Sequence, residues 1–99
     1  MTAHSVTVHE VISTDGRFIS AYASSAKAAS MADRIGATTA TAQINVGERV
    51  TVRWHGHIKP AEVVAIATPA AVMVRFVGRA GQAPIERRMS VADVERRRR

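Results

Sequence analysis

The apolar positions near the start of the chain alternate with polar ones. One alternating run covers residues 6–12, and a second apolar run covers residues 18–22. A period of two is typical of a β-strand with one buried face. Asp15 and Gly16 lie between the runs, and a glycine readily adopts the positive φ that a tight turn needs. The pattern therefore predicts a β-hairpin.

A helical period follows the hairpin. Ser24 or Ser25 can cap the first free amides, and Gly36 occupies the position of a left-handed residue after a last turn that contains Arg34. The apolar residues recur at the spacing of one helix face: Ala28, Met31, Ala32 and Ile35. We expect a short helix whose shallow, alanine-rich face lies close against the hairpin. Residues 37–44 have no clear period and are interpreted as a linker or an added edge strand.

From Val46 onward the pattern is consistently that of β-strands. Four strands are expected, over residues 48–54, 61–68, 72–77 and 85–89. Turn residues separate them: Gly56 and Pro60, then Thr68 and Pro69, then Gly78 and Gly81. Ser90 and Asp93 have the spacing of a capping box, in which Ser90 caps the amide of Asp93 and starts one helical turn. Val94 would then close the core.

Short strands that end in a single helical turn are a feature of small barrels. The stretches Val46–Trp54, Ala61–Ile66, Val72–Phe76 and Ser90–Val94 resemble a Tudor-like or Src-homology-3-like barrel. The resemblance implies an α+β fold in which the hairpin and short helix pack with a small β-barrel. The expected units are residues 1–44 and 45–99. Because 45-residue units would each be marginally stable, a shared core within one continuous domain is favoured.

Barrels of this kind bind methylated side chains, peptides, RNA or DNA. The methyl-binding members resemble one another in a cage of three or four aromatic rings that holds the ammonium group. Only Trp54 and Phe76 occupy plausible positions, and Lys59 and Pro60 stand where an aromatic residue is frequent. The sequence therefore does not favour a methyl-lysine or methyl-arginine reader.

Residues that could carry catalysis are sparse. The chain has no cysteine, which excludes disulfides, thiolate zinc sites and cysteine nucleophiles. His55 and His57 could chelate a metal only with a third ligand, and the sequence offers none at a suitable spacing. The Gly78–Gly81 segment lacks the Lys-Ser/Thr ending of a phosphate loop, and no Ser-His-Asp arrangement is apparent. We expect a non-enzymatic protein without metal or cofactor.

Charge distinguishes the two parts of this 99-residue chain, whose formal net charge is +6. Residues 1–44 hold three basic and three acidic groups, whereas residues 45–99 hold eleven basic and five acidic groups. The sequence contains no apolar stretch long enough to span a bilayer and no secretory signal at its start, so a cytoplasmic protein is expected. The high content of alanine and of arginine over lysine suggests a high-GC genome.

Binding of nucleic acid, DNA or RNA, is the first hypothesis for the basic part. Guanidinium groups bind phosphate oxygens, so contacts to the backbone with little sequence preference are expected. The candidate residues are Arg49, Arg53, Arg75, Arg87, Arg88, Arg96, Arg97, Arg98 and Arg99. The alternative for the strand arginines is a solvated outer face, in which Glu62 and Glu86 pair with some of them. The alternative for the terminal run is a frayed, solubilising end.

The second functional hypothesis is a protein-interaction accessory factor. In this interpretation the neutral hairpin and helix bind a partner protein or a second copy of the chain as a homodimer. The first 35 residues resemble small bacteriophage and bacterial proteins of unassigned function, in which a hairpin precedes an alanine-rich helix. This resemblance brings no catalytic residues. The small size, the lack of cysteine and the alanine- and arginine-rich composition resemble a bacteriophage accessory protein, which implies binding to a host or virion component.

Overall fold

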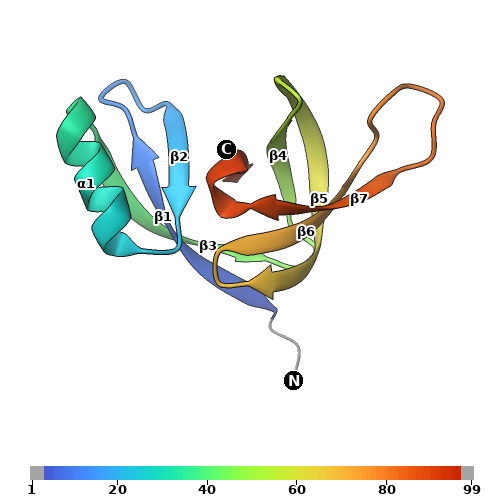
Figure 1. Cartoon of the computed structure of the whole chain (residues 1–99), viewed down its shortest axis with the longest axis horizontal. Coiled ribbons are helices and arrows are strands. Elements are labelled where there is room, and N and C mark those ends of the chain that lie inside the picture. The colour runs from blue at the N-terminus through green and yellow to red at the C-terminus, as the bar shows by residue number, and fades with distance from the viewer. Residues whose placement is uncertain (1–3, 97–99) are drawn as a thin grey trace.

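The computed structural model describes residues 4–96 and contains eight strands, one α-helix and one 3-10 turn (Figure 1). The elements are β1 (Ser5–Ile12), β2 (Phe18–Tyr22), α1 (Ser25–Ile35), β3 (Thr38–Asn45), β4 (Arg49–Trp54), β5 (His57–Thr68), β6 (Ala71–Phe76), β7 (Ile85–Ser90), η1 (Val91–Asp93) and β8 (Val94–Arg96). The strands form two antiparallel sheets, ordered β2-β1-β3 and β7-β6-β5-β4-β8. The predicted α+β class is confirmed, whereas both described sheets are open, so no ladder closes a barrel.

The predicted hairpin is formed by β1 and β2. Gly16 adopts a φ of 87°, as the turn requires, and the Ser13 amide donates to the Arg17 carbonyl at 2.9 Å. The Ser13 hydroxyl also donates to the Asp15 carboxylate. This hydrogen bond is the main cause that lowers the pKa of Asp15 below its usual range. The hydrogen bonds within residues 13–17 therefore favour the same hairpin that the alternation of apolar residues predicts.

The helix begins and ends at the predicted residues. Ser24 is its N-cap, with a side-chain oxygen that accepts from the Lys27 amide at 3.3 Å, and Gly36 ends it with a φ of 72°. The predicted apolar face is only partly correct. Ala28 and Ala32 are buried, but Ile35 is 47% exposed. Two small side chains let the helix approach the sheet closely, so the buried stripe is narrow.

Residues 37–44 were interpreted as either a linker or an edge strand, and all but the first of them belong to strand β3. β3 pairs with β1 over eight residues, from Thr38 opposite Ile12 to Asn45 opposite Ser5. Threonines suit a pleated, half-exposed surface, which explains why this polar segment is extended. The linker interpretation is wrong, because β1 takes β3 as its second neighbour.

In the second half, the turn predicted at Gly56 and Pro60 is confirmed only at Gly56, and one predicted cap is wrong. Pro60 lies inside β5, which begins at His57 and is twelve residues long. Ladder pairing of β5 with β6 begins only at Glu62, so at Pro60 the strand has one ladder neighbour and a missing amide hydrogen is tolerated. The Ser90 hydroxyl accepts from the Ala92 amide, at 3.2 Å, instead of that of Asp93, because the turn is 3-10.

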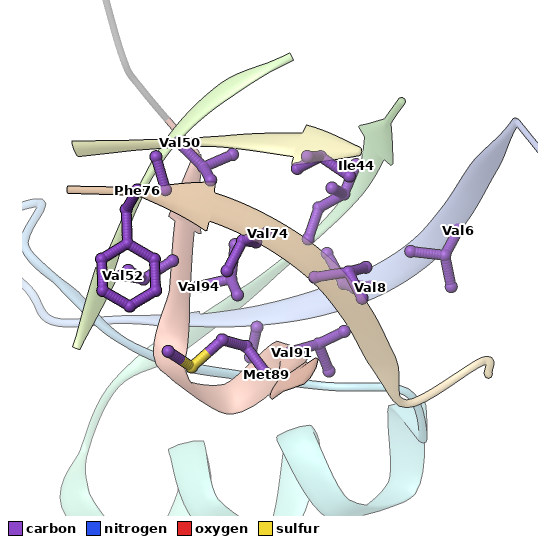
Figure 2. Packing of buried hydrophobic residues seen from close by; sticks show 14 residues of the cluster. Val6, Val8, Ile44, Val50, Val52, Val74, Phe76, Met89, Val91 and Val94 are labelled. Atoms are coloured by element: carbon purple, nitrogen blue, oxygen red, sulfur yellow. The ribbon is translucent and has the colours of Figure 1, made fainter. Parts of the chain in front are cut away.

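The two sheets share a core. Val6, Val8 and Ile44 of the small sheet pack in one buried cluster with valines of the large sheet (Figure 2). The cluster comprises Val6, Val8, Ala21, Ile44, Val50, Val52, Ala61, Val63, Val72, Val74, Phe76, Met89, Val91 and Val94. The helix packs on the opposite face of the small sheet, where Val11, Ala28 and Ala32 form a second cluster. Residues assigned to two units by sequence therefore pack together.

Candidate nucleic-acid interface

The β4–β5 hairpin turn positions one end of the candidate site. His55 and Gly56 are its two central residues, with φ values of 49° and 77°. Positive φ at both positions is the hallmark of a type I′ turn, which matches the twist of the flanking strands. The His55 ring lies edge-on to Trp54, with ring centroids 4.5 Å apart. The turn and the β6–β7 loop project to the same side of the molecule (Figure 1).

Between this hairpin and the start of the β6–β7 loop lies an open groove of about 350 Å³. Its lining residues are Trp54, His55, His57, Lys59, Gly78 and Arg79. The Lys59 ammonium donates to the Gly78 carbonyl at 3.0 Å, which joins the hairpin to the loop. A Cβ on Gly78 would lie 2.7 Å from Ile85 Cδ1 and 3.2 Å from Trp54 Cη2, so only glycine fits without a shift.

The groove is electropositive. Its lining contains one ammonium, one guanidinium and two imidazoles, and no carboxylate. Within residues 4–96, no carboxylate forms an ion pair with Lys59 or Arg79. Two cations without a carboxylate partner in a concave surface attract anions, and ammonium, guanidinium and imidazole N–H groups can all donate hydrogen bonds to phosphate oxygens.

Glu62 and Glu86, in contrast, lie on the opposite face of the large sheet in a row of alternating charge. Arg49 pairs across the ladder with Glu62, Glu62 with Arg75, and Arg75 with Glu86. Residues directly opposite one another project to the same face. The Arg75 guanidinium donates to Glu86 Oε2, with Nη2 at 2.9 Å and Nε at 3.3 Å. Glu86 therefore compensates the charge of Arg75, whereas Arg49 has Glu62 only as its cross-strand neighbour.

Arg53 connects the two sheets. Its Nη2 donates to the Ile19 carbonyl at 2.9 Å, and its guanidinium carbon lies 5.8 Å from the centre of the Phe18 ring. Arg53, predicted to bind phosphate, thus holds the β1–β2 hairpin of the small sheet against β4 of the large sheet.

Replacing Arg53 by alanine is expected to lower the free energy of unfolding by about 1 kcal/mol, because this hydrogen bond and ring contact are lost. Chemical denaturation followed by Trp54 fluorescence measures the change. Arg88→Ala is the matched control, and a shift under about 0.5 kcal/mol is expected for it. Equal midpoints for the two variants would contradict the connecting role of Arg53.

Arg87 and Arg88 are exposed on β7, and no carboxylate among residues 4–96 forms an ion pair with either. Arg87 is paired with Val74 and so lies on the face of the sheet that carries the groove, whereas Arg88 is paired with Met73 on the other face. Ile85, two residues before Arg87, packs beside Gly78. The structure therefore places Arg87 on the same face as the groove.

Arg96 belongs to a strand and not to a frayed end. It lies in β8 and approaches two carboxylates, with Nη1 3.9 Å from Glu10 Oε1 and Nε 3.6 Å from Glu48 Oε2. Glu10 is only 3% exposed. Burying a carboxylate without a counter-charge is costly, so Arg96 stabilises the fold. The predicted site residues Arg97, Arg98 and Arg99 lie outside the described residues.

Sequence reasoning missed Lys59, His57 and Arg79 as parts of one site. Lys59 was considered only as a missing cage residue, and Arg79 only as part of a turn. The available signal was the register of the hairpin: Trp54 pairs with His57, and Val52 with Lys59, so all four share a face. Across residues 4–96, no group of three or more His, Asp or Glu side chains is arranged to hold a metal ion.

The fold and the groove define a class rather than an individual protein: a small α+β domain of two antiparallel sheets with an open cationic groove. Comparison with known protein families, with curated proteins and with solved structures finds no match to this chain. In the described part of the chain, the helix is too short to cross a membrane.

Proposed function

We propose that this protein is a non-enzymatic binding module that contacts the phosphate backbone of nucleic acid with little sequence preference. The observation that carries the proposal is the groove between the β4–β5 hairpin and the β6–β7 loop. It gathers Lys59, Arg79 and two histidines without a carboxylate in its lining. Arg87 extends this surface on the same face of β7.

The architecture supports a barrel-like binding domain. The large sheet has the order β7-β6-β5-β4-β8, and a 3-10 turn precedes its last strand. This arrangement supports the resemblance to Tudor-like and Src-homology-3-like barrels. The groove lining contains one candidate aromatic cage residue, Trp54, and two cations, Lys59 and Arg79, which disfavours a methylated ammonium ligand and favours an anion.

Backbone contact is favoured over base recognition. Trp54 is half-buried, and the rings of His55 and Phe76 lie edge-on against it at 4.5 and 5.2 Å. Stacking of a base needs a free ring face, and successive bases need several. Ammonium and guanidinium groups, however, contact phosphate oxygens whatever the base.

A salt-dependent titration tests the proposed function. Fluorescence anisotropy of labelled duplex DNA and of single-stranded RNA is measured with the full chain and with a chain that ends at Arg96, which keeps all of β8. We expect dissociation constants of about 1–100 µM that weaken as salt rises, with binding retained in part by the shortened chain. Failure of both chains to bind at low salt would overturn the proposal. Loss of binding in the shortened chain alone would move the proposed contact to Arg97–Arg99.

Protein binding is the second candidate, favoured by a separate observation. A shallow groove of about 230 Å³ is lined by Arg49, Pro60, Ala61, Glu62, Arg75, Phe76, Val77 and Pro84. Val77 is 46% exposed, and Ile58, on the same hairpin as Pro60, is 70% exposed. Exposed apolar side chains that lie close together favour a surface that binds another protein. Binding of a partner protein through these apolar groups would tolerate added salt, whereas phosphate contact would weaken, so the salt dependence of affinity separates the two candidates.

A further inference from the structure

β3 is the open edge of the small sheet. Its eight residues pair with β1 along their full length, and the order β2-β1-β3 gives it no second neighbour within residues 4–96. An unpaired strand edge presents a row of backbone donors and acceptors that can pair with another strand.

The register determines which backbone groups face outward. The Val46 amide donates to the His4 carbonyl at 2.9 Å, at the end of the β1–β3 ladder. Because pairing alternates along an antiparallel strand, the even-numbered residues of β3 bond to β1 and the odd-numbered ones face the open edge. Asn45 agrees with this assignment, since its amide donates to Glu48 Oε1 at 3.0 Å instead of to β1. Thr39, Thr41 and Gln43 therefore present three amides and three carbonyls.

The other edges of the two sheets are protected. β7 carries Glu86, Arg87 and Arg88, and charged side chains discourage edge pairing. β2 is in contact with η1 and β8, which lie beside it (Figure 1). β3, with the sequence Thr-Thr-Ala-Thr-Ala-Gln-Ile-Asn, contains neither charge nor proline. It is thus the edge on which pairing is least opposed.

We propose that β3 pairs with β3 of a second copy of this chain to form an antiparallel homodimer. A two-fold axis at Thr41 places Thr41 opposite the partner's Thr41, and Thr39 opposite the partner's Gln43. The outward amides and carbonyls then form six reciprocal hydrogen bonds, in the pattern of an antiparallel ladder. The result is a continuous six-stranded sheet, β2-β1-β3-β3-β1-β2.

A second copy suits this edge better than an unrelated strand. The two-fold arrangement uses all six outward groups, and an isologous interface requires only that the strand be complementary to itself. Because β3 contains no charged residue, no two like charges would face each other across the two-fold axis. On the face that carries Ile44, the nearest opposed residues are Ala40 and Ala42, whose small side chains permit close approach.

Measurement of mass against concentration tests the dimer. We expect sedimentation equilibrium of the full chain to show a concentration-dependent rise from 10.6 kDa toward twice that mass. Thr41→Lys and Thr41→Glu each place like charges across the axis, so each variant alone should associate at least about tenfold more weakly. An equimolar mixture of the two variants should recover the dimer, because opposite charges then face each other. Thr41→Ser is the matched control and should retain dimerisation.

Hydrogen exchange gives a second readout that does not depend on a variant. The amides of Thr39, Thr41 and Gln43 should exchange more slowly as protein concentration rises. The amides of Ala40 and Ala42, which bond to β1, should be protected at every concentration. A chain that stays at 10.6 kDa up to about millimolar concentration, or a dimer in which those three amides stay unprotected, overturns the proposal. Neither result bears on nucleic-acid binding, because the groove lies on the other sheet.

Discussion

Replacement of Ile44 by alanine is expected to lower the free energy of unfolding by about 3 kcal/mol. Ile44 belongs to β3 in the small sheet, yet it is fully buried in the cluster that contains Val50, Val63 and Val94 of the large sheet. Removal of three buried carbons leaves a cavity that the two facing sheets cannot close without moving apart. Both sheets should therefore lose stability together.

Denaturation followed by two probes makes this prediction specific. Trp54 lies in the large sheet, so its fluorescence reports on the sheet to which Ile44 does not belong, and far-ultraviolet circular dichroism reports on the whole chain. The matched control is Ile35→Ala, which truncates the same residue type at a site 47% exposed and should cost less than about 1 kcal/mol. Two separate transitions, or an unchanged Trp54 midpoint in the Ile44 variant, would show that the two halves fold independently.

Removal of the two groove charges is expected to weaken nucleic-acid binding by at least about tenfold. The variant combines Lys59→Gln and Arg79→Gln, which keeps a hydrogen-bond donor near the Gly78 carbonyl while it removes both cations from the lining. The slope of the logarithm of the affinity against the logarithm of salt concentration should fall by about two, since about two phosphate contacts are lost.

A second double variant separates local contact from overall charge. Arg49→Gln and Arg75→Gln together remove the same net charge, but from the row in which Glu86 pairs with Arg75 and Glu62 lies opposite Arg49. We expect this pair to change affinity less than about threefold. Equal losses in the two double variants would indicate that only net charge matters, and a larger loss in the Arg49/Arg75 variant would move the interface to the outer face.

The local elements of the fold could be predicted because short-range chemistry determines them. The Asp15-Gly16 turn, the N-cap and the Gly36 terminus depend on residues within a few positions of one another; the turn and the terminus were correctly placed, and the N-cap was narrowed to Ser24 or Ser25. β4 and β6 were also recognised, since their valines alternate over a strand length. Pro60 was misleading because tolerance of a proline in a strand depends on whether a neighbouring strand needs its amide.

The candidate site could be predicted only in part. The sequence alone determined that the second half is basic, that the protein lacks cysteine chemistry and that arginines alternate with valines in the strands. It did not determine which of those charges are compensated, because Glu86 reaches Arg75 from another strand and Glu10 reaches Arg96 from the other half of the chain.

Only the tertiary structure decided where the surface is cationic and which strand edge is open. Strand pairing brings Lys59 and Arg79 together from two different hairpins, and it turns Arg53 toward Ile19 in the first half of the chain. It also leaves β3 with a single neighbour. Periodicity tells which face of a strand is buried, whereas the strands that lie beside it depend on contacts between residues distant in sequence.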